Sequence, residues 1–172
     1  MLRLLICLWV LLPSSALAQK QVTLQASDGL TVSADIYTAS TAADATWIVL
    51  AHQAGASRGE YRTIAPRLNK LGYNAIALYQ RSGRAFAGVT NKTAALAKSK
   101  KKSRSYLAAR PDIEAGIAWA RQQTSGAVIL WGSSYSAALA LLMSGESLTL
   151  LTESFRMRWV NTSVVNQSAK SL

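Results

Sequence analysis

The feature of the sequence that most limits its fold is a short polar turn between two apolar segments. Residues 128–131 form a continuous apolar run, and the polar stretch 132–136 follows it directly. Residues 137–143 are then almost wholly apolar and stop shortly before Gly145. A strand that is apolar on both faces belongs inside a sheet, and a helix that is apolar all round must be buried. The sequence therefore predicts a buried strand that turns sharply into a buried helix.

The preceding part of the chain alternates strand-like and helix-like segments in the same manner. Residues 21–37 alternate apolar and polar positions around Asp28 and Gly29, which is typical of a hairpin. Apolar runs predict buried strands at 47–51 and 74–79, and helical spacing is found at 63–71, around 93–98 and from Pro111 to just before Gly126. This order predicts an α/β fold with a mostly parallel sheet and helices on both faces.

The first 18 residues have the layout of a cleavable secretory signal. Arg3 precedes an apolar run at 4–12, and small residues up to Ala18 precede Gln19. A membrane anchor is the alternative, but the run is only about half as long as a membrane-spanning helix. We therefore predict cleavage after Ala18, export to the periplasm or the cell exterior, and no stable membrane anchor afterwards. Cleavage also removes Cys7, the only cysteine, and with it any internal disulfide or cysteine metal site.

Ser134 is the candidate nucleophile in the polar turn. A strand-to-helix turn that exposes a serine hydroxyl needs small residues two positions before and two after the serine, because the backbones approach closely there. Gly132 and Ser136 meet this requirement around Ser134. The flanking positions of Ser133 would be Trp131 and Tyr135, which are too bulky. The alternative to a nucleophile turn is a plain polar loop between strand and helix.

Three stretches together resemble a dienelactone-hydrolase-related branch of the α/β-hydrolase superfamily. They are residues 51–57 (AHQAGAS), residues 65–68 with 71–74 (APRL, LGYN) and residues 131–137 (WGSSYSA). The resemblance covers roughly residues 22–146 and implies an incomplete α/β-hydrolase three-layer sandwich over 19–146. It fades in the tail, residues 147–172, whose homology to this family is doubtful.

The resemblance also implies roles for single residues. The loop after the strand at 47–51 would give a backbone N–H of Gln53 or Ala54 to an oxyanion hole, and the N–H of Tyr135 would be the second donor. His52 falls in that loop, where it would shape the backbone by a side-chain hydrogen bond; a role as catalytic base would need an unfamiliar geometry. The implied activity is hydrolysis of a small carboxylic ester with no metal and no cofactor.

The other two members of the expected catalytic triad are missing after Ser134. The family's order is serine, then an acid, then a histidine, but the chain offers only Glu146 and Glu153 there, and its single histidine is His52. Because a serine without a base is a poor nucleophile, we expect the chain to be inactive as it stands.

The tail differs in pattern from the rest of the chain. Phe155, Met157 and Trp159 alternate with Arg156 and Arg158, as in a strand with one apolar face. Such a segment could substitute for one strand that the resemblance leads us to expect. Our hypothesis is that the gene was truncated or frame-shifted near residue 145.

The net charge of +11 supports a second class of function. Residues 98–104 carry five cations without an acid, so Lys100, Lys101 and Lys102 could bind a polyanion, although no aromatic residues are interleaved as in nucleic-acid platforms. A solvated loop is the plainer explanation of this run. The sequence thus leaves three alternatives: an exported ester hydrolase, a non-catalytic secreted binding protein, and a fragment without a stable fold.

Overall fold

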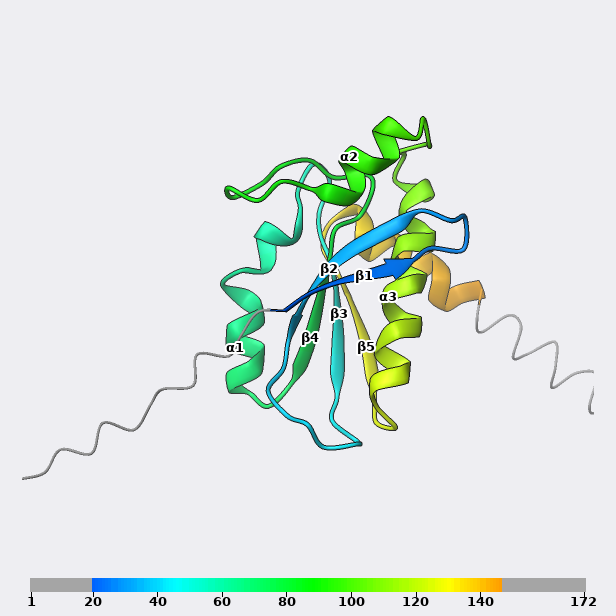
Figure 1. Ribbon diagram of the computed structural model, residues 1–172. Helices are drawn as coiled ribbons and strands as arrows, with labels where there is room; N and C mark the ends of the chain where they lie inside the picture. Colours follow the sequence, from blue (N-terminus) through cyan, green and yellow to red (C-terminus); the bar gives the residue numbers. More distant parts are fainter. Residues whose placement is uncertain (1–19, 147–172) are drawn as a thin grey trace, which may run out of the picture.

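The structure, a computed structural model, describes residues 20–146, which form a mixed five-stranded sheet with helices on both faces (Figure 1). The strands are β1 (Lys20–Gln25), β2 (Thr31–Tyr37), β3 (Trp47–Ala51), β4 (Asn74–Leu78) and β5 (Val128–Gly132), in the order β1-β2-β4-β3-β5. β3 pairs in parallel with β4 and β5, whereas β2 pairs antiparallel with β1 and β4. Only β2 therefore runs against the other four strands of the described sheet.

Helical segments connect these strands along the chain. They are η1 (Arg58–Tyr61), α1 (Ile64–Lys70), α2 (Lys92–Ser99), η2 (Leu107–Ala109), α3 (Arg110–Gln123) and a last helix at 135–146. None of the helices within residues 20–146 has the length and apolarity that a membrane crossing requires. The predicted signal at 1–18 and the tail at 147–172 lie outside the described residues.

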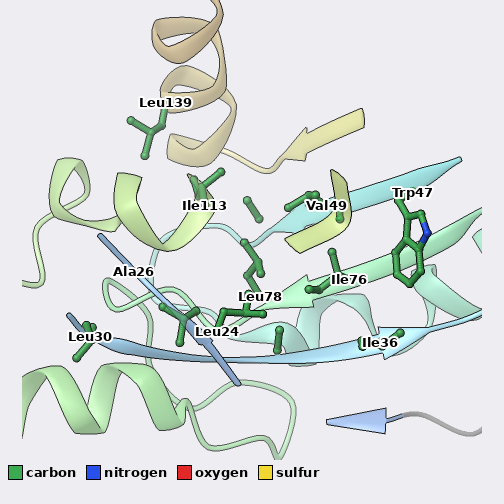
Figure 2. Close-up of a cluster of buried hydrophobic side chains, with 14 of the residues drawn as sticks. Leu24, Ala26, Leu30, Ile36, Trp47, Val49, Ile76, Leu78, Ile113 and Leu139 are labelled. Carbon is green, nitrogen blue, oxygen red and sulfur yellow. The ribbon is translucent and has the colours of Figure 1, made fainter. Parts of the chain in front are cut away.

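The two faces of the sheet bury two separate apolar clusters. Ile48 and Leu50 of β3 point to the side covered by α1, where they pack with Leu68. Val49 points to the other side, where α3 and helix 135–146 contribute Ile113 and Leu139 (Figure 2). Because neighbouring residues of a strand face opposite sides, the wholly apolar β3 contributes side chains to both clusters. This layering confirms the predicted α/β class and the helices on both faces.

Two predictions of burial at the end of this fold are wrong. β5 lies at the edge of the sheet, so Ile129 and Trp131 are 45% and 44% exposed instead of being covered on both faces. Helix 135–146 is likewise not buried all round, since Leu141 is 74% exposed. The physical reason is the same for both elements: among residues 20–146, no strand or helix follows to cover them.

Candidate active site at the carboxyl end of the sheet

Ser134 occupies a strained turn between β5 and helix 135–146. Its φ is +53°, in the left-handed region that serine seldom adopts and that costs about 1–3 kcal/mol. The Ala137 N–H donates to the Ser134 carbonyl at 2.9 Å, which closes the first turn of the helix. A Cβ placed on Gly132 would lie 2.4 Å from the Ser136 carbonyl oxygen, so only glycine fits there. The close backbone approach that the sequence required around Ser134 is therefore present.

Ser136 joins this turn to the loop that follows β3. Its hydroxyl donates to the His52 carbonyl at 2.7 Å and accepts from the Gln80 amide nitrogen at 3.0 Å. The Gln80 amide also donates to the Tyr135 hydroxyl at 2.7 Å, and the Gln80 carbonyl accepts from Asn91 at 2.9 Å. Three loops at the carboxyl ends of β3, β4 and β5 are therefore held together around one buried glutamine.

Gln80 and Asn91 were not predicted from the sequence. A polar residue directly after a buried strand was the available signal, because the carboxyl ends of parallel strands meet at one edge of a sheet. The sequence pattern indicated only that Ser136 is small enough for the turn. The structure shows that its hydroxyl makes a specific contact with the loop after β3, which glycine could not make.

His52 is fully buried and both of its ring nitrogens are engaged by backbone groups. Nδ1 lies 2.8 Å from the Gln53 carbonyl and must donate to it, whereas Nε2 accepts from the Gln80 N–H at 3.0 Å. This pattern assigns the neutral tautomer with the proton on Nδ1. To take a proton from Ser134, Nε2 would have to give up the Gln80 N–H. The geometry therefore favours the loop-shaping role of His52 over a role as base.

We expect the burial of His52 to make the stability of the protein depend on pH. Burial is the main cause that lowers the pKa of His52 from its ordinary value of 6.5. As the pH falls below about 6.5, the unfolded chain binds a proton that the folded chain rejects, so the free energy of unfolding decreases by up to about 1.4 kcal/mol per pH unit. Urea unfolding at pH values from neutral to mildly acidic would measure this slope.

The matched control for this slope is His52→Gln, which removes the titrating ring. Whatever its stability at neutral pH, the free energy of unfolding of the variant should lack the slope that begins near pH 6.5. Asp28 does not interfere in this range, because the hydrogen bond from Arg81 holds the pKa of Asp28 well below that of an ordinary carboxyl group. An equal slope in both proteins would contradict the prediction.

The two candidate donors after β3 differ in whether their N–H is occupied. The Gln53 N–H donates to the Glu60 carboxylate at 2.9 Å. The Ala54 N–H has no acceptor within the described part of the chain. Tyr135 is the first residue of helix 135–146, so its N–H has no partner within the helix. The N–H groups of Ala54 and Tyr135 therefore remain open within residues 20–146, whereas that of Gln53 is already satisfied.

A cleft of about 790 Å³ adjoins the loop that carries Ala54. It is lined by Gly55, Ser82, Arg84, Arg104, Ser105 and Tyr106. Arg104 is fixed in place by hydrogen bonds to the carbonyls of Arg81 and Gly83, at 3.1 and 2.9 Å. The ring of Tyr106 stacks on that of Tyr135 at 4.5 Å between centroids, so it forms an aromatic wall next to the turn of Ser134. The lining contains two guanidinium groups and no carboxylate.

The remaining predicted residues lie in other surroundings. Lys102 donates to the Asp28 carbonyl at 2.6 Å, which ties it to the β1–β2 turn, and Lys100 and Lys101 are exposed at the end of α2. Polyanion binding by these lysines stays a prediction.

The two acidic residues after Ser134 do not supply a triad partner within residues 20–146. Glu146 pairs with Arg110 at 2.6 Å, and Glu153 lies outside the described residues. Within residues 20–146, no three His, Cys, Asp or Glu side chains are grouped to hold a metal ion.

Comparison with known proteins identifies the fold. No family model and no curated protein matches the sequence. Among solved structures, an esterase of Pyrococcus furiosus is 19% identical with a TM-score of 0.51, over 70% of this chain and 44% of that one. An α/β hydrolase of Novosphingobium aromaticivorans is 15% identical with a TM-score of 0.51, over 74% of this chain and 40% of that one. The chain thus has the α/β-hydrolase fold and spans less than half the length of either protein.

Proposed function

We propose, from the premise of an α/β-hydrolase fold, that Ser134 is the nucleophile of a serine hydrolase that acts on carboxylic esters. The observation that carries this proposal is the left-handed Ser134 at the carboxyl end of β5, in a turn that the bond from Ser136 to the His52 carbonyl joins to the loop of Ala54. The N–H groups of Ala54 and Tyr135 are open within residues 20–146. Membership of the dienelactone-hydrolase-related branch and export after cleavage at Ala18 are further parts of the proposal. The sequence motifs and the signal-like first 18 residues support them.

In the proposed mechanism, the Ser134 hydroxyl adds to the ester carbonyl and gives up its proton to water or an added base, while the Ala54 and Tyr135 N–H groups stabilise the oxyanion. The carbon–oxygen bond to the alcohol then breaks, the alcohol leaves with a proton, and water hydrolyses the acyl group on Ser134 to the free acid. Two such donors lower a barrier by a few kcal/mol when they converge on the developing charge. The bond from Ser136 to the His52 carbonyl keeps the two donors in register, because it links the loop of Ala54 to the turn of Tyr135.

Residues 20–146 supply the nucleophile and the oxyanion donors but no base for Ser134. His52, the only histidine of the sequence, is buried and bonded on both ring nitrogens. Removal of the triad partners lowers the rate by several powers of ten in serine hydrolases. We therefore propose that the 172-residue chain turns over esters very slowly unless a base is added.

Imidazole in solution tests this proposal because it can take the place of a missing histidine. We expect imidazole to accelerate hydrolysis of p-nitrophenyl acetate by the protein beyond the rate of imidazole alone. The Ser134→Ala variant should give only the imidazole background, whereas Ser133→Ala, the neighbouring serine, should keep the acceleration. Labelling with a fluorophosphonate probe, with imidazole present, should follow the same order. Acceleration that survives in Ser134→Ala would refute Ser134 as the nucleophile.

A further inference from the structure

The cleft beside the loop of Ala54 carries positive charge that no acid among residues 20–146 neutralises. Arg84 and Arg104 line it, and neither arginine forms an ion pair within that range. Both belong to the segment between β4 and α3, which lies over the carboxyl ends of β3 and β4 (Figure 1). Two unpaired guanidinium groups in one cleft attract an anion.

Arg104 is fixed in place while part of its guanidinium stays free. Its Nε donates to the Arg81 carbonyl and its Nη2 to the Gly83 carbonyl, at 3.1 and 2.9 Å. A guanidinium has five N–H donors, so the others remain for a ligand. The Arg84 side chain is exposed and makes no hydrogen bond within residues 20–146, so all of its donors remain. The cleft therefore combines one fixed and one adaptable guanidinium.

The serine hydroxyls of the cleft also act as donors. The Ser105 Oγ accepts from the Ala108 N–H at 3.2 Å, and its own hydrogen has no acceptor within residues 20–146. The Tyr135 hydroxyl accepts from the Gln80 amide at 2.7 Å and is bonded to the Ser82 hydroxyl. With Tyr135 as the donor in that pair, Ser82 keeps its hydrogen for a ligand.

The cleft thus offers donors and positive charge, which match a ligand group that only accepts hydrogen bonds. The Gly55 N–H adds a further donor, since it has no acceptor in the described part of the chain. A carboxylate has one charge and about four acceptor positions, fewer than the free donors of this lining. A phosphate monoester has about two charges at pH 7 and three acceptor oxygens with more positions. Charge and donor number both favour phosphate.

The cleft is connected directly to the turn of Ser134. The ring of Tyr106 stacks on that of Tyr135 at 4.5 Å between centroids, and the Ser82 hydroxyl is bonded to the Tyr135 hydroxyl. Gly55 belongs to the same loop as the proposed oxyanion donor. The volume of about 790 Å³ lies within the range of small-molecule sites, about 300–1,000 Å³, so it has room for more than a phosphate group.

We propose that this cleft binds the phosphate group of the ester substrate through Arg84 and Arg104. Ser134 then attacks a carboxylic ester elsewhere in the same molecule, and the phosphate itself is not cleaved. The inference rests on the proposed function of Ser134, to which it adds a substrate class: carboxylic esters that carry a phosphate monoester.

Binding of phenyl phosphate to the full chain, measured by isothermal titration calorimetry, tests the cleft without any reaction. We expect Arg84→Gln to weaken binding about tenfold or more, because charge-assisted hydrogen bonds to the phosphate are lost. Since the Arg84 side chain contacts no described acceptor, this variant should fold as the unaltered protein does. Arg67→Gln is the matched control: it removes the same charge from an exposed arginine of α1, outside the cleft, and should leave the affinity unchanged.

Three results of this titration would overturn the inference. The first is that phenyl phosphate does not bind the unaltered protein. The second is an equal loss of affinity in Arg67→Gln, which would assign the binding to overall charge. The third is benzoate binding as tightly as phenyl phosphate, which would assign the cleft to a carboxylate.

A second measurement separates this inference from the proposed function of Ser134. With imidazole added, release of acetate from 4-acetoxyphenyl phosphate should be faster than from phenyl acetate, and Arg84→Gln should lose this preference. Ser134→Ala should bind phenyl phosphate as before but release acetate only at the imidazole background. If phenyl phosphate binds and neither ester is hydrolysed, the proposed function fails while the phosphate site stands. If both esters react equally fast, Ser134 stands and the phosphorylated substrate is overturned.

Discussion

Replacing Asp112 by alanine is expected to lower the free energy of unfolding by about 3–5 kcal/mol. Asp112 is fully buried in the first turn of α3 and accepts from the Arg81 guanidinium at 2.7 Å and from the Arg81 N–H at 2.8 Å. Arg81 is itself only 2% exposed and also binds Asp28 at 2.6 Å. Loss of Asp112 leaves a buried guanidinium with half of its partners. The penalty arises from that uncompensated charge and not from the strength of the pair as such.

Urea denaturation of the variant and the unaltered protein would measure this loss. Glu114→Ala is the matched control on the same helix. Glu114 pairs with Arg110 at 2.7 Å, but both side chains are partly exposed to solvent, so its loss should cost far less. Equal losses in the two variants would show that burial of Arg81 and Asp112 carries no special penalty.

Replacing Gly132 by alanine is expected to disrupt the turn of Ser134 and to destabilise the protein by about 3 kcal/mol, the upper end for overpacking. The added Cβ would lie 2.4 Å from the carbonyl carbon and oxygen of Ser136 and 2.6 Å from the Ala137 nitrogen. These are backbone atoms of the helix that begins there, so they cannot rotate away as a side chain would. The displaced helix would move Ser134 and the Tyr135 N–H together.

Two measurements test the Gly132 prediction independently. The midpoint of urea unfolding should fall, and fluorophosphonate labelling with added imidazole should be lost. Gly145→Ala is the control, because a Cβ there meets nothing within 4 Å and a helical glycine is replaced by a better helix former. That variant should keep its labelling and be as stable as the unaltered protein or slightly more so. Wild-type behaviour of Gly132→Ala would contradict the close packing of the turn.

The order of elements was predictable because each element carries a local signal. The apolar run of β3 and the helical spacing before Gly72 each depend on residues that are close in the sequence. The predicted helix start near Thr63 is one such case, since α1 begins at Ile64. Exposure of β5 was not predictable in this way. The sequence of an apolar strand does not indicate whether the strand lies in the centre of a sheet or at its edge.

In the candidate site, too, residues with a local sequence signal could be predicted, whereas contacts between distant residues could not. Ser134 could be found from its small neighbours at fixed spacing, and its loop partners could be listed as Gln53 or Ala54. The choice between these two depends on Glu60, which takes the Gln53 N–H from seven residues away in another turn. No local pattern predicts that contact. Glu60 was accordingly not predicted to be part of the site.

By itself the sequence determined the α/β class, the strand-to-helix turn at Ser134 and the lack of a histidine after it. These follow from periodicity, residue size and composition, which are local properties. Only the tertiary structure decided that His52 is buried and bonded on both ring nitrogens, that Gln80 joins three loops and that β5 has an open edge. Each of these depends on groups brought together from distant parts of the chain. Hydrogen bonds and burial are properties of that assembly, because the free energy of each group depends on the partner that replaces water around it.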